Sequence, residues 1–247
     1  MGKRVLAAFS FAAIAGMMAF VWAPWASSAP STTTSACGTT YAPVLDPANF
    51  VGVIDNPYFP LPVGRTLVYE GVRDGQTQTD TVKVTDQKKL ILGIQTIVVD
   101  DVATHGSTVL EKTFDFYAQD KLGNVWYLGE DTTAFLPNGK TDTSGSFVAG
   151  VNGAQPGIIM EANPQIPDAY RQECAAGQAE DTAWVVGTTG SVSITYGKVR
   201  NVLSTLEATR IEPGAYDEKV YGPGLGIVSE RSLTGPNEFA VLVSVSG

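Results

Sequence analysis

The chain has 247 residues, 44% of them hydrophobic, and its 25 acidic residues outnumber its 16 basic ones, for a formal charge of −9. This length is enough to bury a sizeable core and is usual for one β-rich domain. The acidic excess argues against nucleic acids and anionic membrane surfaces as partners, because Lys and Arg provide the attraction to both.

The first 29 residues have the order of a secretory signal peptide. Lys3 and Arg4 precede the apolar run Val5–Trp22, and small residues ending at Ala29 follow it. We therefore predict a signal peptide over residues 1–29 and a secreted or cell-envelope location. The run reaches roughly 18 residues, so an uncleaved N-terminal membrane anchor is the alternative. Without Lys3 and Arg4, 14 basic and 25 acidic residues leave a charge near −11.

The next segment, residues 30–43, is rich in small polar side chains and predicts a flexible spacer ahead of a single domain over residues 44–247. It holds Cys37, and the one other cysteine in the chain is Cys174. In an exported protein such a pair predicts a disulfide that ties the spacer to the domain. Lipid attachment at Cys37 is disfavoured, because the cysteine does not follow the apolar run directly.

Residues 56–62, NPYFPLP, cannot form a helix, because prolines fix φ and push the residues before them toward extended conformations. We expect an extended lead into the first strand. The runs RTLVYEGV and TQTDTVKV then flank Asp74-Gly75, a pair that favours a tight β-hairpin turn.

Further runs rich in β-branched residues continue to the C-terminus, separated by Gly, Pro, Asn or Asp: LILGIQTIVVDDV, SITYG, VRNVLSTLEAT, DEKVYG, GIVSERSL and EFAVLVSV. The pattern predicts an all-β fold of about ten to twelve strands, an antiparallel meander curled into a barrel, half-barrel or sandwich. At most one or two short helices are expected, and Ala175–Val186 is the nearest candidate.

The stretch Tyr117–Asp131, YAQDKLGNVWYLGED, resembles a calcium loop at first sight. Counted from Asp120, however, the third and sixth places hold Leu122 and Val125, where such a loop needs an oxygen ligand and a glycine. As a hairpin the residues fit: Phe114 and Phe116 face one side, Asp115, Tyr117 and Gln119 the other, Asp120–Asn124 turn around Gly123, and Val125–Leu128 return.

His105 is the one histidine, so any Ser–His–Asp or Cys–His arrangement must use it. A solvated turn residue is the preferred interpretation. Zinc sites built from several His and Cys are excluded by count.

Acidic side chains in the irregular part of the chain, residues 130–182, are the route to a catalytic site. Two carboxylates at a suitable separation perform acid–base or glycosidic chemistry, and several together bind calcium. The catalytic hypothesis is a hydrolase or lyase that uses carboxylates among Glu161, Glu173, Glu180 and Asp181, assisted by Tyr170 or Arg171.

Aromatic side chains are the route to a binding site, since apolar pockets occur in the mouths of barrels. Plain core packing is the competing interpretation. The residues predicted to bind a ligand are Phe116, Trp126, Tyr127, Tyr170, Trp184 and Tyr221.

Four segments together resemble an uncharacterised family of exported bacterial proteins: NPYFPLPVGRTLVYEG, YAQDKLGNVWYLGED, AGVNGAQPGIIMEANPQIPDAYRQE and YGPGLGIVSE. The resemblance covers about residues 44–245 and implies an exported β-rich protein with no established activity. KVYGPGLGIVSE is also similar to a strand–turn–strand of periplasmic lipoprotein-carrier proteins, although the helices of those carriers are missing here.

These observations lead to one preferred function and two alternatives. We expect an exported, non-catalytic binding protein for a small apolar or amphipathic molecule, without a cofactor. The alternatives are the carboxylate-dependent enzyme and a structural, envelope-associated or calcium-binding protein. The sequence does not indicate an oligomeric state.

Overall fold

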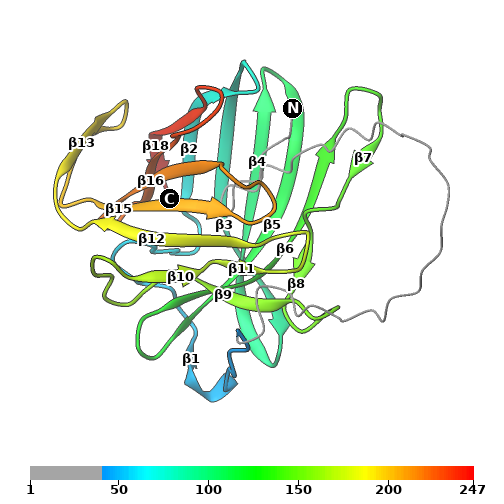
Figure 1. The fold of residues 1–247 in the computed structure, drawn as a ribbon, viewed down its shortest axis with the longest axis vertical. Coiled ribbons are helices and arrows are strands. Elements are labelled where there is room, and N and C mark those ends of the chain that lie inside the picture. The colour runs from blue at the N-terminus through cyan, green and yellow to red at the C-terminus, as the bar shows by residue number, and fades with distance from the viewer. Residues whose placement is uncertain (1–40) are drawn as a thin grey trace.

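The protein is built almost entirely from β-strands. A computed structural model describes residues 41–247, and the one helical element in that range is a single 3-10 turn, η1 (Pro47–Asn49). The predicted all-β class is therefore confirmed. Figure 1 shows the strands wrapped into a curved body, with β18 beside β2.

The described residues form eighteen strands. The N-terminal strands are β1 (Phe50–Val51), β2 (Thr66–Arg73), β3 (Gln76–Ile91), β4 (Ile94–His105), β5 (Thr108–Asp120) and β6 (Val125–Phe135). Short central strands follow, β7 (Thr141–Asp142), β8 (Phe147–Val148), β9 (Gln155–Met160), β10 (Ala169–Arg171) and β11 (Glu173–Cys174). The C-terminal strands are β12 (Asp181–Gly187), β13 (Ser191–Ile194), β14 (Gly197–Arg200), β15 (Leu203–Thr209), β16 (Tyr216–Gly222), β17 (Gly226–Ser232) and β18 (Phe239–Ser246). Eleven have six or more residues, in line with the ten to twelve predicted, and the others have two to four.

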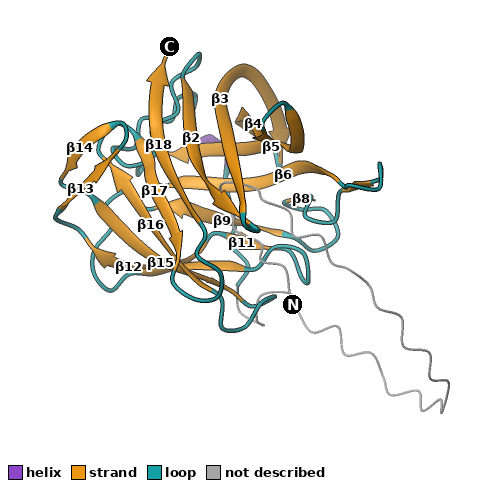
Figure 2. Ribbon diagram, turned by 90° about the horizontal axis from the view of Figure 1, so that it is seen from above, coloured by secondary structure: helices purple, strands orange, loops and turns teal. Residues whose placement is uncertain are grey.

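All strands but two belong to one antiparallel sheet, ordered β10-β12-β15-β16-β17-β18-β2-β3-β4-β5-β6-β9-β11. β1 pairs with β5, β7 and β8 pair with β6, and β13 and β14 form a separate hairpin. The two ends of the sheet, β10 and β11, are consecutive in the chain and separated only by Gln172, whose N–H donates to the carbonyl of Asp181 (2.9 Å). The sheet therefore curls until its edges nearly meet in a barrel (Figure 2).

Both predicted hairpins are confirmed. Asp74 and Gly75 have φ of 49° and 73° between β2 and β3, the left-handed backbone that a two-residue turn of this kind requires. Between β5 and β6, Asp120 Oδ1 accepts hydrogen bonds from the N–H groups of Leu122 and Asn124, both at 2.9 Å. Asp120 is therefore a turn residue that bonds its own backbone.

One half of the barrel interior is an apolar core. Strand alternation directs every second side chain inward, and the inward residues near this end include Leu67, Val84 and Tyr221. Residues 54–61 close the same end, because Phe59 packs against Tyr117 with ring centroids 5.2 Å apart. The proline-rich segment thus leads into β2, as expected, and also covers the apolar end of the barrel.

A second, smaller apolar cluster lies on the outer face of β4, β5 and β6. Phe116 and Tyr117 are neighbours on β5, yet Phe116 belongs to this outer cluster and Tyr117 to the inner core. Because successive strand residues face opposite sides, the sheet here carries apolar side chains on both faces. Phe50 and Trp126 pack against the outer cluster.

The short helix considered over Ala175–Val186 is wrong. Ala175 and Ala179 form an isolated β-bridge, and β12 begins at Asp181. Asp181, Ala183 and Val185 are all buried, which is the two-residue period of a strand and not the period of a helix.

Several predictions lie outside the described residues. These are the signal peptide over residues 1–29, most of the spacer over residues 30–43, and Cys37. Cys174 is fully buried on β11, paired in register with Gln155. Tyr41, four residues after Cys37, donates to the carbonyl of Pro156 (2.8 Å), a residue of β9 that pairs with Glu173 of β11. The chain at Tyr41 is therefore close to β11. The Cys37–Cys174 disulfide stays a prediction. Residues 41–247 contain no helix of the length and hydropathy needed to cross a membrane.

Candidate functional site

The second half of the barrel interior is lined by carboxyl groups. Ten acidic side chains on the inward positions of the strands are at most 6% exposed: Asp80, Asp101, Glu111, Asp115, Glu130, Glu173, Asp181, Glu207, Asp217 and Glu230. Acidic residues are rarely buried unless they are paired, so this interior needs compensating protons, cations or hydrogen bonds.

Glu207 is the best-compensated member of this group. Its Oε2 lies 2.7 Å from Lys219 Nζ, and neither side chain is exposed by more than 3%. Its Oε1 accepts from Thr205 Oγ1 (2.8 Å), Gln172 Nε2 (3.1 Å) and Tyr221 Oη (3.2 Å). Burial alone would lower the pKa of Lys219, but Glu207 and Glu230 raise it above its usual value. The pair is therefore a charged salt bridge held inside the barrel.

Asp80 and Asp101 form a carboxyl pair on neighbouring strands. Burial raises the pKa of both side chains, and the hydrogen bond and charge of Asp80 push the pKa of Asp101 higher still. Two interacting carboxyl groups cannot both ionise easily, which favours the form of the pair that holds one proton.

The structure brings together two of the acids proposed for catalysis. Glu173 and Asp181 both face the interior, and burial, with Asp181 next in weight, raises the pKa of Glu173 well above its usual range. Glu180 instead points outward to Arg210 (3.7 Å), and Arg171 lies 5.5 Å from the ring of Tyr41.

The remaining candidates of that set, Tyr170 and Glu161, lie outside the pair Glu173 and Asp181. Tyr170 is buried in the apolar core, and Glu161 lies beside Asp168 in the loop before β10, where burial raises the pKa of Glu161 to about 7. The charge of Glu161 contributes to the raised pKa of Tyr170, after burial and Glu207, so these two are near each other, whereas Glu173 and Asp181 are the two neighbouring acids.

The six aromatic residues predicted to bind a ligand are divided between the two faces of the sheet. Tyr127, Tyr170 and Tyr221 are core residues inside the barrel. Phe116 and Trp126 belong to the outer cluster, and Trp184 is 36% exposed on β12. The three tyrosines therefore pack in the core, as the competing interpretation expected.

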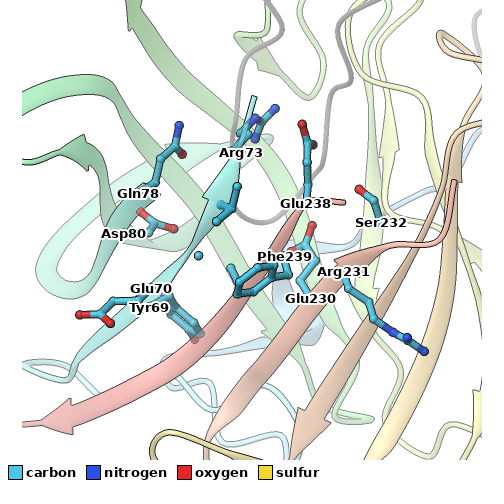
Figure 3. A pocket seen from close by; sticks show the side chains of 13 residues that line it. Tyr69, Glu70, Arg73, Gln78, Asp80, Glu230, Arg231, Ser232, Glu238 and Phe239 are labelled. Atoms are coloured by element: carbon cyan, nitrogen blue, oxygen red, sulfur yellow. The ribbon is translucent and has the colours of Figure 1, made fainter. Parts of the chain in front are cut away.

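Among the hollows in the described part of the chain, three bear on ligand binding. The first, of about 30 Å³, lies in the polar half of the barrel between β2–β3 and β17–β18 (Figure 3). The second, of about 40 Å³, lies beside Phe59 and Tyr117, under residues 54–61. A water molecule needs roughly 10–15 Å³ measured in this way, so either has room for only a few waters.

The third hollow is on the outside and has a volume of about 320 Å³. We call it the outer hollow; it is lined by Val44, Leu45, Asp46, Asn49, Phe50, Asp120, Lys121, Leu122 and Trp126. It lies where β1 pairs with β5, with the N–H of Lys121 donating to the carbonyl of Asn49 (2.8 Å). Trp126 Nε1 donates to Asp120 Oδ2 (2.9 Å), which fixes the indole at its wall.

Within residues 41–247 no three His, Cys, Asp or Glu side chains are arranged to hold a metal ion. His105 is exposed at the end of β4, where its Nδ1 lies 2.7 Å from the carbonyl oxygen of Thr77. This is the solvated position preferred for it.

No family model and no curated protein sequence matches this chain. Two solved structures are similar to it: a protein described as exported, with a YmcC-like fold, from Bacteroides fragilis, and a protein described as a lipoprotein from Parabacteroides distasonis. The first has 15% sequence identity and a TM-score of 0.45, the second 12% and 0.43, and each match covers 77% of this chain and 99% of the other. These values are too low to transfer a function, and the resemblance to an uncharacterised exported family stays a prediction.

Proposed function

We propose that this protein is an exported, non-catalytic binding protein that holds a small amphipathic molecule in the outer hollow. The observation that carries this proposal is the hollow itself, because its volume of about 320 Å³ falls within the range of small-molecule sites, roughly 300–1,000 Å³. Export is supported by the signal-like order of residues 1–29.

The lining suits a ligand with an apolar body and a polar end. Val44 and Leu122 are 96% and 82% exposed, so two large apolar side chains meet water at the same hollow. Grouped apolar side chains of this kind mark binding surfaces more often than isolated ones do. Asp46 and Lys121 add polar groups of both signs to the lining, which can orient a charged or hydroxylated end.

Tryptophan fluorescence tests this proposal, because Trp126 lies in the wall of the hollow and Trp184 lies on β12. A long-chain fatty acid or alkyl glucoside titrated into the protein is expected to change the emission saturably. The change should persist in Trp184→Phe and vanish in Trp126→Phe. The reverse result, or no saturable change with either class of probe, argues against the outer hollow.

A pair of matched leucine variants locates the site. Leu122→Ser removes an apolar side chain that a ligand would cover, and burial of a leucine is worth about 2 kcal/mol, so affinity should fall roughly tenfold or more. Leu90, which is 72% exposed and outside the hollow, provides the control Leu90→Ser with unchanged affinity. Mass spectrometry of protein purified from its own organism identifies the natural ligand if one remains bound.

A further inference from the structure

The cavity of about 30 Å³ between β2–β3 and β17–β18 has a mainly apolar surface, with several hydrogen-bond acceptors in its walls. Both carboxylate oxygens of Glu230, Gln78 Oε1 and Ser232 Oγ are buried and have no hydrogen-bond partner among the described residues. Glu230 is only 5% exposed and lines the cavity. Figure 3 shows Gln78 on one side of the cavity and Glu230 and Ser232 on the other.

The space exists because the residues of the barrel wall have small side chains at this place. Gly71 on β2 pairs in register with Ala240 on β18, and both line the cavity. A Cβ at position 71 would collide with the carbonyl of Phe239, so the backbone contact between the strands requires glycine there. The cavity reaches the surface, since Arg231 and Phe239, which also line it, are solvent-exposed.

The charge around Glu230 is predominantly negative. The groups that face it are Lys219 and Asp217 from β16, Glu207 from β15, Arg73 from β2, Asp80 from β3, and Glu238 just before β18. Lys219 is already bound to Glu207. A buried carboxylate that is surrounded by more acidic than basic groups is stabilised by an additional cation that also donates hydrogen bonds.

We propose that this cavity binds a protonated primary amine, with the ammonium group donating to the Glu230 carboxylate and to Ser232 Oγ on the same strand. An ammonium group has three N–H donors and the size of a water molecule, which matches both the acceptors and the volume. A divalent metal is a poorer fit, because calcium takes six to eight oxygen ligands and the described residues hold no acid cluster for it. Any alkyl or sugar portion of the amine would extend through the opening beside Phe239.

Proton competition gives this site a distinctive signature. Burial raises the pKa of Glu230 to about 8, against the opposing effect of Lys219. The carboxyl group is therefore mostly protonated at pH 7 and mostly ionised at pH 9, whereas an alkylammonium, like lysine with a pKa of about 10.4, stays charged. Amine binding should tighten about tenfold between pH 7 and pH 9.

Methylammonium chloride is the probe, compared at equal ionic strength with potassium chloride, calcium chloride and tetramethylammonium chloride in a buffer without primary amines. Two non-hydrogen atoms limit the Kd to the order of 10 mM. At about 200 mM and pH 9, methylammonium should therefore raise the Tm of the purified protein by about 4–7 °C. An equal rise with tetramethylammonium or potassium, a rise with calcium alone, or no rise overturns the proposal.

Variants assign the effect to the cavity. Glu230→Gln keeps the shape of the side chain and should weaken methylammonium binding at least tenfold while removing its pH dependence. Glu218→Gln is the matched control, because Glu218 lies on the adjacent strand on the outer face, and binding should be unchanged. If Glu230→Gln does not fold, Ser232→Ala carries the test with an affinity loss of about threefold to fivefold. Unchanged affinity in the variant that folds overturns the assignment.

Discussion

Two ion pairs of nearly equal length allow the cost of a buried charge to be measured in this barrel. Lys219 Nζ lies 2.7 Å from Glu207 Oε2 with both side chains buried, whereas Arg231 Nε lies 2.6 Å from Glu218 Oε2 with side chains 62% and 26% exposed. We expect Lys219→Met to lower the free energy of unfolding at pH 7 by about 3–5 kcal/mol, because it leaves the Glu207 charge without its cation.

The magnitude follows from what remains around Glu207 in that variant. Three donors still reach its Oε1, which limits the loss, but Glu230 is a further acid close to the place that the ammonium vacates. A domain is stable by about 5–15 kcal/mol, so about a fifth or more of the total would be lost. The expected fall in Tm is about 10 °C. Arg231→Met removes a cation of equal charge at the surface and should cost less than about 1 kcal/mol.

Urea denaturation at pH 7, followed by circular dichroism, measures both variants. The double variant Lys219→Met with Glu207→Gln removes the uncompensated charge and should recover stability to within about 2 kcal/mol of the wild type. If Lys219→Met and Arg231→Met cost the same, the inference that the inner pair is charged and desolvated is refuted.

Three other predictions concern stability. Burial raises the pKa of Glu230 to about 8, above its unfolded value near 4.5. Its contribution to stability is therefore full below pH 4.5 and is lost as the pH rises to about 8, a loss of up to about 5 kcal/mol. Chemical denaturation from pH 5 to pH 9 should show a flatter stability profile for Glu230→Gln than for the wild type. Gly129 has φ of 137°, and an added Cβ would touch the carbonyl of Phe147, so Gly129→Ala should cost at least about 2 kcal/mol, whereas Gly139→Ala, with positive φ but open space, should cost about 1 kcal/mol in the same assay. The predicted disulfide should appear as an intact mass about 2 Da below that of the reduced protein, and its removal in Cys37→Ser should cost about 2–5 kcal/mol; a free thiol at Cys174 contradicts it.

Local patterns were enough to predict the class of the fold. Asp74-Gly75 allows the positive φ values of a hairpin turn, and the alternation of Phe114 to Gln119 assigns each side chain to the face on which it is found. Both signals act over a few residues. The segment Ala175–Val186 was misjudged because alanines favour helices locally, while pairing of β12 with β15 decides its structure at long range.

The buried carboxyl groups were harder to predict, because acidic residues are usually exposed. One signal was present. Adjacent acids on a strand must face opposite sides, so one member of each pair is directed inward. The pairs Asp100-Asp101, Glu130-Asp131 and Asp217-Glu218 each have one buried and one more exposed member. Which carboxyl groups meet across the barrel depends on the closure of the sheet at Gln172, which no local pattern contains.

The charge of the barrel interior links its stability to its binding properties. Lys219 neutralises Glu207, and the pair Asp80 and Asp101 can share a proton, but Glu230 faces the cavity with both oxygens unbonded. Lys219 and Arg73 favour its ionised form, but burial and the nearby acids outweigh them, so a proton or a bound cation would compensate the group further. A proton stabilises the protein below pH 8, and an amine would replace it above that pH, so the two should compete for one position. Methylammonium should therefore release about one proton per molecule bound near pH 7, and none in Glu230→Gln, which calorimetry in two buffers of different ionisation enthalpy can measure.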